Sequence, residues 1–346
     1  YYFDWMRRSQ LGMSMAYAFF PAQMLTVLPL GWVFYLHGSL TVETFITVII
    51  LSLGMSAPIV AAFNFVDTLA QVGTTVGQVD EILKAEEQEH GEQAVSLTNH
   101  DIQVNNVSFG YHEGNEILHG VSLSIPQNSM TALVGPSGSG KSTLAKLIAG
   151  FWDVKDGCIT MGGHDLKDIP LHQLYDQVAF VSQDNYLFDD TVRENIRMGR
   201  RDATDAEVEA AAHAAGCDSF IGGLENGFDT MVGGGGAHLS GGERQRISIA
   251  RAMLKDAPII VLDEATAYIN PENEAVIQRA VAKLVENKTV IIIAHRLSTI
   301  TNADNIAVVK DGRIAAQGRH EELLESSPLY KEMWQAHIGA KDGDAE

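Results

Sequence analysis

Apolar residues dominate the first quarter of the chain, and their pattern predicts two helices long enough to cross a bilayer. Residues 9–83 contain neither lysine nor arginine. A membrane span needs about 20 predominantly apolar residues. Two stretches, 11–36 and 42–65, meet that length with Glu43 as the one charged residue in them, and a short turn at 37–41 joins them. The alternative, a pair of helices buried in a large soluble core, is disfavoured by the length and the missing charge.

Helical spacing continues beyond the second stretch. Apolar residues recur every three or four positions over 66–83, while polar residues fill the other face. We therefore expect one long helix that leaves the bilayer. Arg7 and Arg8 precede the first span, which places that end in the cytoplasm by the positive-inside rule. The expected location is the plasma membrane, multi-pass, with the following domain in the cytoplasm.

The charge pattern suggests three segments. We interpret residues 1–85 as a partial transmembrane domain and 86–100 as a linker, whose acidic start we expect to be a solvated spacer. Residues 101–340 form a separate domain. The chain begins at Tyr1 rather than at a methionine, so we expect an upstream part to precede it.

The third segment carries the signs of an α/β fold. Alternating apolar residues predict strands near 102–109, with a bulge at Asn105–Asn106, and near 121–125. Unbroken apolar runs, with helical stretches between them, are typical of a parallel sheet buried on both faces. Three such runs occur, at 178–181, 259–262 and 290–293, and a fourth, at 130–134, is apolar except for Thr131.

A phosphate-binding motif follows the run at 130–134. It matches G-x-x-x-x-G-K-[ST] and consists of Gly135, Pro136, Ser137, Gly138, Ser139, Gly140, Lys141, Ser142 and Thr143. Glycines let the backbone curl around a phosphate, and the start of the next helix adds unpaired N–H donors. Lys141 would reach the β- and γ-phosphates of a nucleotide, and the Ser142 hydroxyl would bind Mg²⁺. A chance turn before a helix is the alternative, and the strand, loop and helix in register argue against it.

Polar residues stand directly after the other runs, at the sheet edge where ligands bind in such folds. They are Gln183, Asp263, Glu264 and His295. Asp263 is placed to hold Mg²⁺, and Glu264 to polarise an attacking water as general base. His295 would contact the γ-phosphate, although a histidine at a strand end is often structural.

The net charge and the cysteine positions exclude some classes of partner and metal site. The 346 residues carry a net charge of −20, which gives a nucleic-acid role no electrostatic support. Cys158 and Cys217 lie far apart and in no metal-binding spacing, as is typical of reduced cytosolic cysteines.

The decisive stretch is Leu239–Arg246, which reads LSGGERQR. Ser240 and Glu243 by themselves fit a helix capping box. With the motifs above, the chain resembles the ATP-binding cassette (ABC) family, whose signature is LSGGQ, over residues 101–326. The fold it implies is an α/β P-loop ABC ATPase domain, with a mixed sheet and a helical subdomain, preceded by two transmembrane α-helices.

The resemblance also implies residue roles. Tyr111 corresponds to the aromatic residue that stacks on adenine. Gln183 corresponds to the Q-loop glutamine, which senses Mg²⁺ and water, while Asp263 with Glu264 matches Walker B and His295 the switch histidine. The signature residues that would contact the nucleotide are Ser240, Gly241, Gly242 and Glu243.

An exporter-type half-transporter is the subset that the chain resembles, through Leu187–Phe188, Thr191–Val192 and Glu194–Ile196. The membrane part then corresponds to the last two of six helices, with four upstream helices absent. In this family two ATPase domains pack head to tail, so the implied partners are a second half-transporter, the bilayer and a small-molecule substrate. ATP and Mg²⁺ are the implied ligands.

Two alternatives stay open. Residues 239–252 and 265–274 also resemble iron-chelate importers that have an exporter-type fold. A regulatory module that binds a nucleotide without hydrolysing it belongs to another class, and the retained Glu264 and His295 argue against it. Within the resemblance, export of an amphipathic or apolar compound is the favoured function.

Three positions depart from the family pattern. Glu243 stands where glutamine is commonest, Asn270 stands where an aspartate is usual, and Gly234 stands where exporters usually carry a glutamate. Gly234 belongs to a run of four glycines, 233–236, which we expect to form a loose loop.

Overall fold

A computed structural model describes residues 24–85, 87–112, 114–263, 271–294 and 297–343 of the chain. The chain forms two compact units, Tyr1–Glu87 and Gln88–Glu346. Each unit is described by itself.

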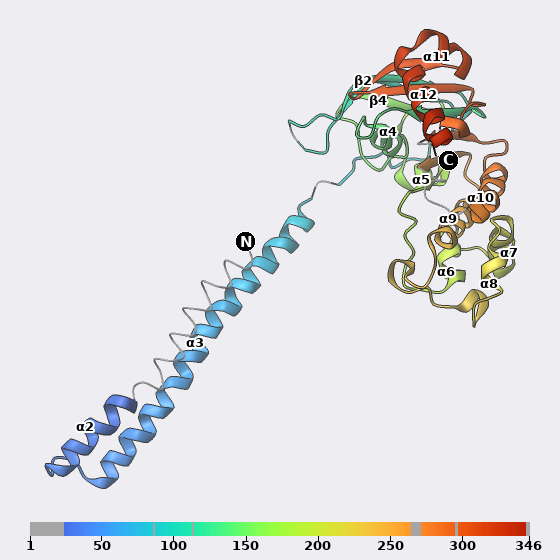
Figure 1. The fold of residues 1–346 in the computed structure, drawn as a ribbon. Helices are drawn as coiled ribbons and strands as arrows, with labels where there is room; N and C mark the ends of the chain where they lie inside the picture. The colour runs from blue at the N-terminus through green and yellow to red at the C-terminus, as the bar shows by residue number, and fades with distance from the viewer. Residues whose placement is uncertain (1–23, 86, 113, 264–270, 295–296, 344–346) are drawn as a thin grey trace. The chain divides into compact units, whose positions relative to one another are not determined.

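Two helices make up the described part of the first unit (Figure 1). Helix α2 (Met24–Leu36) and helix α3 (Val42–Leu83) pack against each other. Thr41 begins α3 as its N-cap, because its hydroxyl accepts a hydrogen bond from the Thr44 N–H at 3.3 Å. The 42 residues of α3 form one helix that covers residues 42–65 and 66–83, so the predicted long helix is present.

The two predicted membrane spans are not confirmed. Among the helices of the described ranges, none has both the length and the apolarity needed to cross a membrane. Only residues 24–36 of the first predicted span are described, and they give a helix of 13 residues.

A six-stranded mixed sheet forms the centre of the second unit. Its strand order is β10 (Arg313–Gly318), β9 (Asn305–Lys310), β3 (Met130–Val134), β8 (Thr289–Ile293), β7 (Ile259–Asp263) and β6 (Val178–Val181). Strand β10 pairs antiparallel with β9, and all other neighbours pair in parallel. The four apolar runs are therefore all strands of one largely parallel sheet, as predicted.

A second sheet is antiparallel and has four strands. Its order is β2 (Leu118–Ile125), β1 (Ile102–Phe109), β4 (Asp156–Met161) and β5 (His164–Asp165). The pairing of β1 with β2 shifts register between Val104 and Val107, and Asn106 has φ +48°. The predicted bulge at Asn105–Asn106 is thus present.

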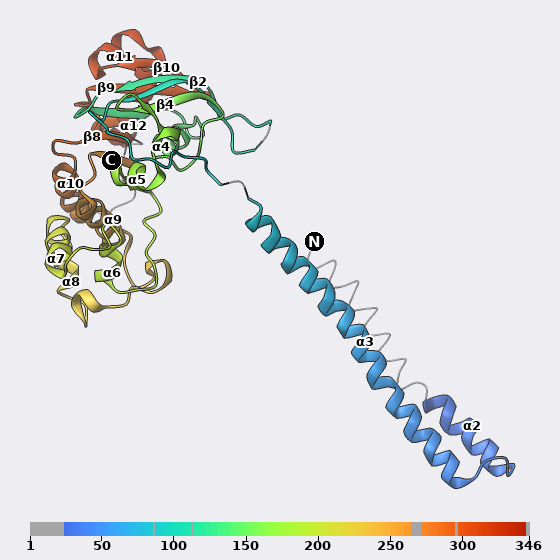
Figure 2. The same cartoon turned by 180° about the vertical axis from the view of Figure 1, so that it is seen from behind.

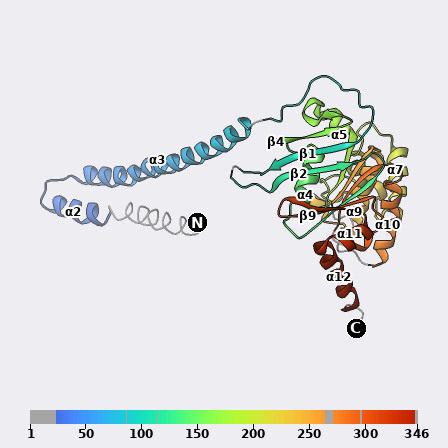
Figure 3. The ribbon, with the colours of Figure 1, turned by 90° about the horizontal axis from the view of Figure 1, so that it is seen from above.

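Helix α4 (Lys141–Ile148) lies beside both sheets (Figure 3). Leu144, Leu147 and Ile148 share one buried core with Val104 of β1 and Leu133 of β3. This packing fixes the start of α4 against the end of β3, where the glycine-rich loop lies.

A helical subdomain occupies one end of the second unit (Figures 1 and 2). It contains α6 (Val192–Arg197), α7 (Asp205–Ala214), α8 (Asp218–Ile221) and α9 (Gly241–Lys255), with the short turns η2 (Gly227–Asp229) and η3 (Gly234–Gly236). Helix α10 (Pro271–Leu284) packs on α9. The remaining elements are η1 (Leu166–Asp168), α5 (Leu171–Gln177), η4 (Leu297–Thr299), α11 (His320–Ser326) and α12 (Pro328–Gly343).

Part of the linker is docked, so the expectation of a solvated spacer over its acidic start is wrong for His90. Its side chain is only 4% exposed. The ring Nδ1 donates to the Ile169 carbonyl at 2.8 Å, and Nε2 lies 3.2 Å from Asp153 Oδ1. A histidine with two fixed partners holds the chain in place, which the charge pattern did not indicate.

Candidate active site

The glycine-rich loop connects β3 to α4, as the motif predicts. A Cβ atom at Gly135 would lie 2.0 Å from the Val309 carbonyl oxygen, and one at Gly140 would lie 2.7 Å from Leu118 Cδ2. Gly140 also has φ +100°, a conformation that other residues adopt at a cost. Neighbouring strands therefore require glycine at both ends of the loop.

Lys141 lies inside this loop. Its residue surface is 5% exposed, and Nζ donates to the carbonyls of Gly135 and Pro136, each at 2.9 Å. Ser139 is equally buried, and its Oγ has no hydrogen-bond partner in the described part of the chain. A buried ammonium group and an unsatisfied hydroxyl beside the start of a helix suit a bound anion such as a phosphate.

Ser142 and Asp263 bring the first turn of α4 to the end of β7. The Ser142 hydroxyl donates to Asp263 Oδ1 at 3.4 Å, and Asp263 is 7% exposed. A hydroxyl and a carboxylate are hard oxygen donors of the kind that Mg²⁺ takes together with phosphate oxygens and water. Ser142 and Asp263, two of the three residues predicted from the sequence to bind the metal, thus lie next to each other, and Gln183 is the third.

Gln183 lies near the same sheet edge. Strands β6 and β7 are parallel, and Val181 pairs with Leu262, so Gln183 and Asp263 follow a matched pair of residues. Gln183 is exposed in a turn, and its backbone carbonyl accepts a hydrogen bond from Asn185 Nδ2 at 3.1 Å. Glu264, Asn270 and His295 lie outside the described residues.

Tyr111 contacts the first turn of α4, the helix that follows the glycine-rich loop. Its hydroxyl donates to Thr143 Oγ1 at 3.4 Å. Its ring packs edge-to-face on Phe109 and on Trp152, with centroids 5.2 Å and 5.4 Å apart. Tyr111 is 36% exposed and Trp152 49%, so two aromatic rings border the loop and remain open to a planar ligand. Trp152 was not predicted, and its only sequence signal is an aromatic pair, Phe151–Trp152, soon after the helix.

The signature stretch forms the start of α9. Ser240 is the N-cap: its N–H donates to Glu243 Oε2 at 2.7 Å, and its Oγ accepts from the Glu243 N–H at 3.4 Å. The predicted capping box is therefore present, and glutamate at position 243 has a local structural role. Ser240 and Gly241 are exposed, and Gly242 is partly buried. The 15-residue helix thus presents its N-terminus outward.

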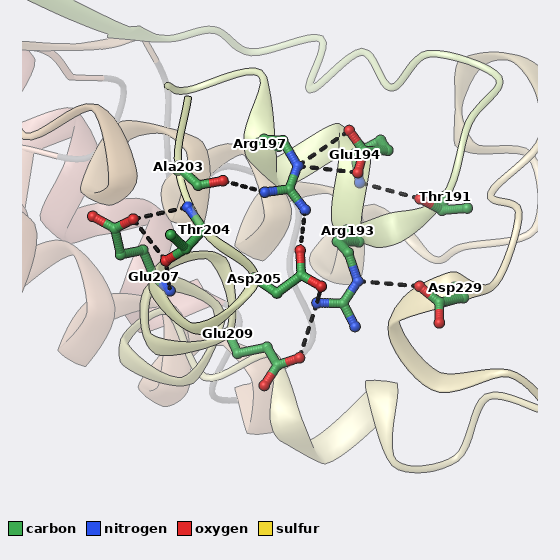
Figure 4. Close-up of polar contacts among 10 residues, drawn as sticks. All are labelled: Thr191, Arg193, Glu194, Arg197, Ala203, Thr204, Asp205, Glu207, Glu209 and Asp229. Atoms are coloured by element: carbon green, nitrogen blue, oxygen red, sulfur yellow. Dashed lines mark hydrogen bonds and ion pairs between the residues drawn. The ribbon is translucent and has the colours of Figure 1, made fainter. Parts of the chain in front are cut away.

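Arginines hold the helical subdomain together (Figure 4). Arg193 on α6 donates to Glu209 at 2.9 Å and to Asp229 at 3.1 Å, while Arg197 bonds Asp205 and Glu194. The hydrogen bond to Glu209 raises the pKa of Arg193, and the hydrogen bond from Arg197 lowers the pKa of Asp205. These contacts tie α6 to α7 and η2.

Arg251 connects α9 to the segment after Gln183. It donates to the Asn195 carbonyl and to Asn195 Oδ1, each at 2.5 Å, and to the Tyr186 carbonyl at 2.7 Å. Burial lowers the pKa of Arg251 to about 10, which leaves it charged at neutral pH. One side chain therefore joins α9 to Tyr186 and Asn195, which follow Gln183 in the chain.

Comparison with known proteins agrees with this geometry. The family described as "ABC transporter" matches residues 118–267. An ATP-dependent lipid A-core flippase of Desulfotalea psychrophila is 44% identical over 86% of this chain and 52% of that protein. ATP-binding cassette sub-family B member 6 of Mus musculus is 49% identical over 68% of this chain and 28% of that protein.

A solved structure extends the comparison to the fold. It is described as "Structure of a bacterial Atm1-family ABC exporter with ATP bound", and it matches with a TM-score of 0.70 and 34% identity over 95% of this chain and 59% of that one. The chain spans about half the length, or less, of the curated relatives named above. Motif, geometry and likeness together show that this chain contains an ABC transporter ATPase domain, with the family match over residues 118–267.

Proposed function

We propose that this chain is the ATP-hydrolysing part of an exporter-type half-transporter. The observation that carries the proposal is the buried Lys141 inside the glycine-rich loop, with Ser142 and Asp263 meeting beside it. The likeness to an exporter solved with ATP bound supports export as the direction. The relatives do not favour the iron-chelate importer that was an alternative. Membership of an ATPase family argues against a module that only binds the nucleotide.

The chain's own residues divide the chemistry among them. Lys141 and the first N–H groups of α4 bind the phosphates, and Ser139 Oγ is a further donor for them. Ser142 and Asp263 would hold Mg²⁺, which when bound neutralises charge on the phosphates. Glu264, directly after Asp263, accepts a proton from the attacking water, with Gln183 and His295 orienting water and γ-phosphate. Tyr111 stacks on the adenine.

A second ATPase domain is needed to complete the nucleotide site. Ser240, Gly241, Gly242 and Glu243 stand at an outward-facing helix start, where N–H donors are available to an anion. In a head-to-tail dimer they close over the nucleotide of the partner. The partner is a second half-transporter, either another copy of this chain or a related one.

Residues 11–36 and 42–65 span the bilayer in this proposal, and the long helix leaves it over residues 66–83. The absence of lysine and arginine from residues 9–83 supports a multi-pass location in the plasma membrane, with the ATPase domain in the cytoplasm. The transported substrate is an amphipathic or apolar small molecule. A net charge of −20 supports no nucleic-acid partner.

Reconstituted full-length protein tests the proposal. In liposomes, ATP should drive movement of a fluorescent phospholipid analogue across the bilayer, and Glu264→Gln should bind ATP while losing at least about a hundredfold in hydrolysis and transport. Glu225→Gln, a change at an exposed acid of the helical subdomain, should stay within about twofold of the parent. Transport of the analogue by Glu264→Gln at the parent rate would contradict the proposal.

A further inference from the structure

The docked linker forms hydrogen bonds with residues 150–153, the segment that follows α4. Gln88 Nε2 donates to the Gly150 carbonyl at 3.3 Å and to Asp153 Oδ1 at 3.2 Å. His90 Nε2 approaches the same Asp153 oxygen at 3.2 Å. Two linker side chains thus converge on one carboxylate, and we call Gln88, His90 and Asp153 the linker clasp.

Both nitrogens of the His90 ring face acceptors. Nδ1 points at a backbone carbonyl, that of Ile169, and Nε2 at the Asp153 carboxylate. A carbonyl oxygen only accepts, so Nδ1 is the donor to Ile169. The His90 side chain is 4% exposed, which shields both contacts from water. A hydrogen-bonded contact of this kind resists displacement better than an exposed ion pair.

Backbone contacts strengthen the grip just beyond His90. The Gly91 N–H donates to the Lys167 carbonyl at 2.8 Å, and a Cβ at Gly91 would lie 2.2 Å from the Asp168 carbonyl oxygen. The linker therefore passes so close to η1 that only glycine fits. In the sequence, Gln88 comes five residues after Leu83, the last residue of α3. The linker clasp thus anchors the chain within the second unit, starting five residues after α3.

The other end of the contact reaches the aromatic rings of the site. Asp153 is bonded in sequence to Trp152, whose ring packs edge-to-face on Tyr111 at 5.4 Å. Trp152 also lies 6.5 Å from Phe109, which packs on Tyr111 from another side. Trp152 therefore packs against the Tyr111 ring, and Asp153 is its direct neighbour in the chain.

We infer that the linker clasp is a positioning device for the nucleotide base: Gln88 and His90 hold Asp153, Asp153 holds Trp152 against Tyr111, and the path from α3 is thereby connected to the base-binding face. This inference rests on the proposed function, because it takes Tyr111 as the residue that meets the adenine. It assigns a role to three residues outside the phosphate site and makes Trp152 a second wall for the base. Displacement of the linker would loosen the base without touching the phosphates.

Two substitutions at His90 separate its two bonds. His90→Gln places an amide nitrogen near the position of Nε2, so it can still donate to Asp153. His90→Asn places one near Nδ1, so it can still donate to Ile169 but leaves Asp153 without this partner. The pair differ by one methylene group, and comparable melting temperatures would establish that both are folded.

The measurement is calorimetric binding to the full-length protein in nanodiscs, with Mg²⁺, of ATP and of inorganic triphosphate, which has no base. We expect His90→Asn to weaken ATP binding by about fivefold to tenfold and to leave triphosphate binding within about twofold, with His90→Gln close to the parent. Trp152→Leu should show the same selective loss, so the inference stays testable if His90→Asn fails to fold.

The binding measurements distinguish failure of the inference from failure of the proposed function. Unchanged ATP affinity in His90→Asn and Trp152→Leu, or equal loss of ATP and triphosphate, would overturn the inference while the proposed function stands. A parent protein that binds neither ligand would overturn the proposed function and the inference with it.

Discussion

The Ser142 hydroxyl lies 3.4 Å from Asp263 Oδ1, although the two residues are 121 positions apart in the chain. Ser142 lies in the first turn of α4, and Asp263 ends strand β7 of the parallel sheet. Folding thus brings together two oxygen donors that are individually weak metal ligands, beside the glycine-rich loop.

Removing either oxygen should lower the affinity of the site for Mg²⁺ and leave the stability of the fold unchanged. We expect Ser142→Ala and Asp263→Asn each to raise the Mg²⁺ concentration for half-maximal ATPase activity by about tenfold or more. Ser219→Ala removes a serine hydroxyl from the helical subdomain, where it bonds only the Gly216 carbonyl in the described contacts, and serves as the control. Mg²⁺ titrations with unchanged midpoints in both site variants would show that this pair does not hold the ion.

Tyr111 offers a test of base binding. Tyr111→Ala removes a ring that would stack on adenine and should weaken ATP binding by about 1–2 kcal/mol, with little change in the maximal rate. Tyr111→Phe keeps the ring and loses only the 3.4 Å hydrogen bond to Thr143, so its KM for ATP should stay near the parent value. If Tyr111→Ala leaves KM unchanged, the ring is a packing partner of Phe109 and Trp152 and nothing more.

The four-glycine run has more order than a loose loop. Gly233, Gly235 and Gly236 have φ of +75°, +67° and +74°, and the Gly236 N–H donates to the Gly233 carbonyl at 2.8 Å. Gly234 differs, because its φ is not positive and a Cβ there would meet nothing within 4 Å. The departure from the family pattern at Gly234 is therefore not required by the local backbone.

A glutamate at this position should fit and should act on coupling. In the complete transporter, Gly234→Glu should keep basal ATPase activity within about twofold and raise substrate-stimulated activity and transport per ATP. Gly235→Glu is the contrasting variant, since a side chain there is strained. Both rates should be measured in liposomes, and ratios that match the parent in Gly234→Glu would mean that the loop has no coupling role.

Asp205 gives a prediction about pH. The hydrogen bond from Arg197, followed by the charge of Arg193, holds its pKa below the ordinary value of about 3.9. A lowered pKa in the folded state contributes stability that is present above about pH 4 and is lost as pH falls through the folded pKa. Asp205→Asn should therefore melt lower than the parent by a constant margin between about pH 7 and pH 5, and the margin should shrink only below about pH 4.

Asp202→Asn is the matched control, because Asp202 is 88% exposed and lies 3.8 Å from Arg200 Nε. Its melting temperature should stay close to the parent at every pH. A margin for Asp205→Asn that already disappears between pH 7 and pH 5 would assign the effect to a histidine instead.

The sequence predicted the parallel strands well for a physical reason. Strands β3, β6, β7 and β8 are largely buried, so most of their residues are apolar. Strand β9 has the same signal over residues 306–309, all buried, and was missed. Strand β4 begins with two exposed residues, Asp156 and Gly157, and β10 has no buried residue, so neither carries a strong apolar pattern.

Some residues of the candidate site could also be predicted from the sequence, and others could not. The glycine-rich loop, the capping box and Asp263 were predictable because each is a contiguous motif or directly follows a buried strand. Trp152 and His90 were not, because their roles depend on contacts with residues far away in the chain, Tyr111 and Asp153. The acidic neighbours of His90 indicated a solvated spacer, whereas burial of its ring places the linker on the domain.

The central claim is that Lys141, buried in the loop, binds the phosphates of ATP for hydrolysis. Its most direct test is the ATPase rate of full-length Lys141→Met beside Lys146→Met, which changes the lysine in the last turn of the same helix. We predict a fall of at least about a hundredfold for Lys141→Met and a rate within about twofold of the parent for Lys146→Met. A Lys141→Met protein that hydrolyses ATP at the parent rate would contradict the account.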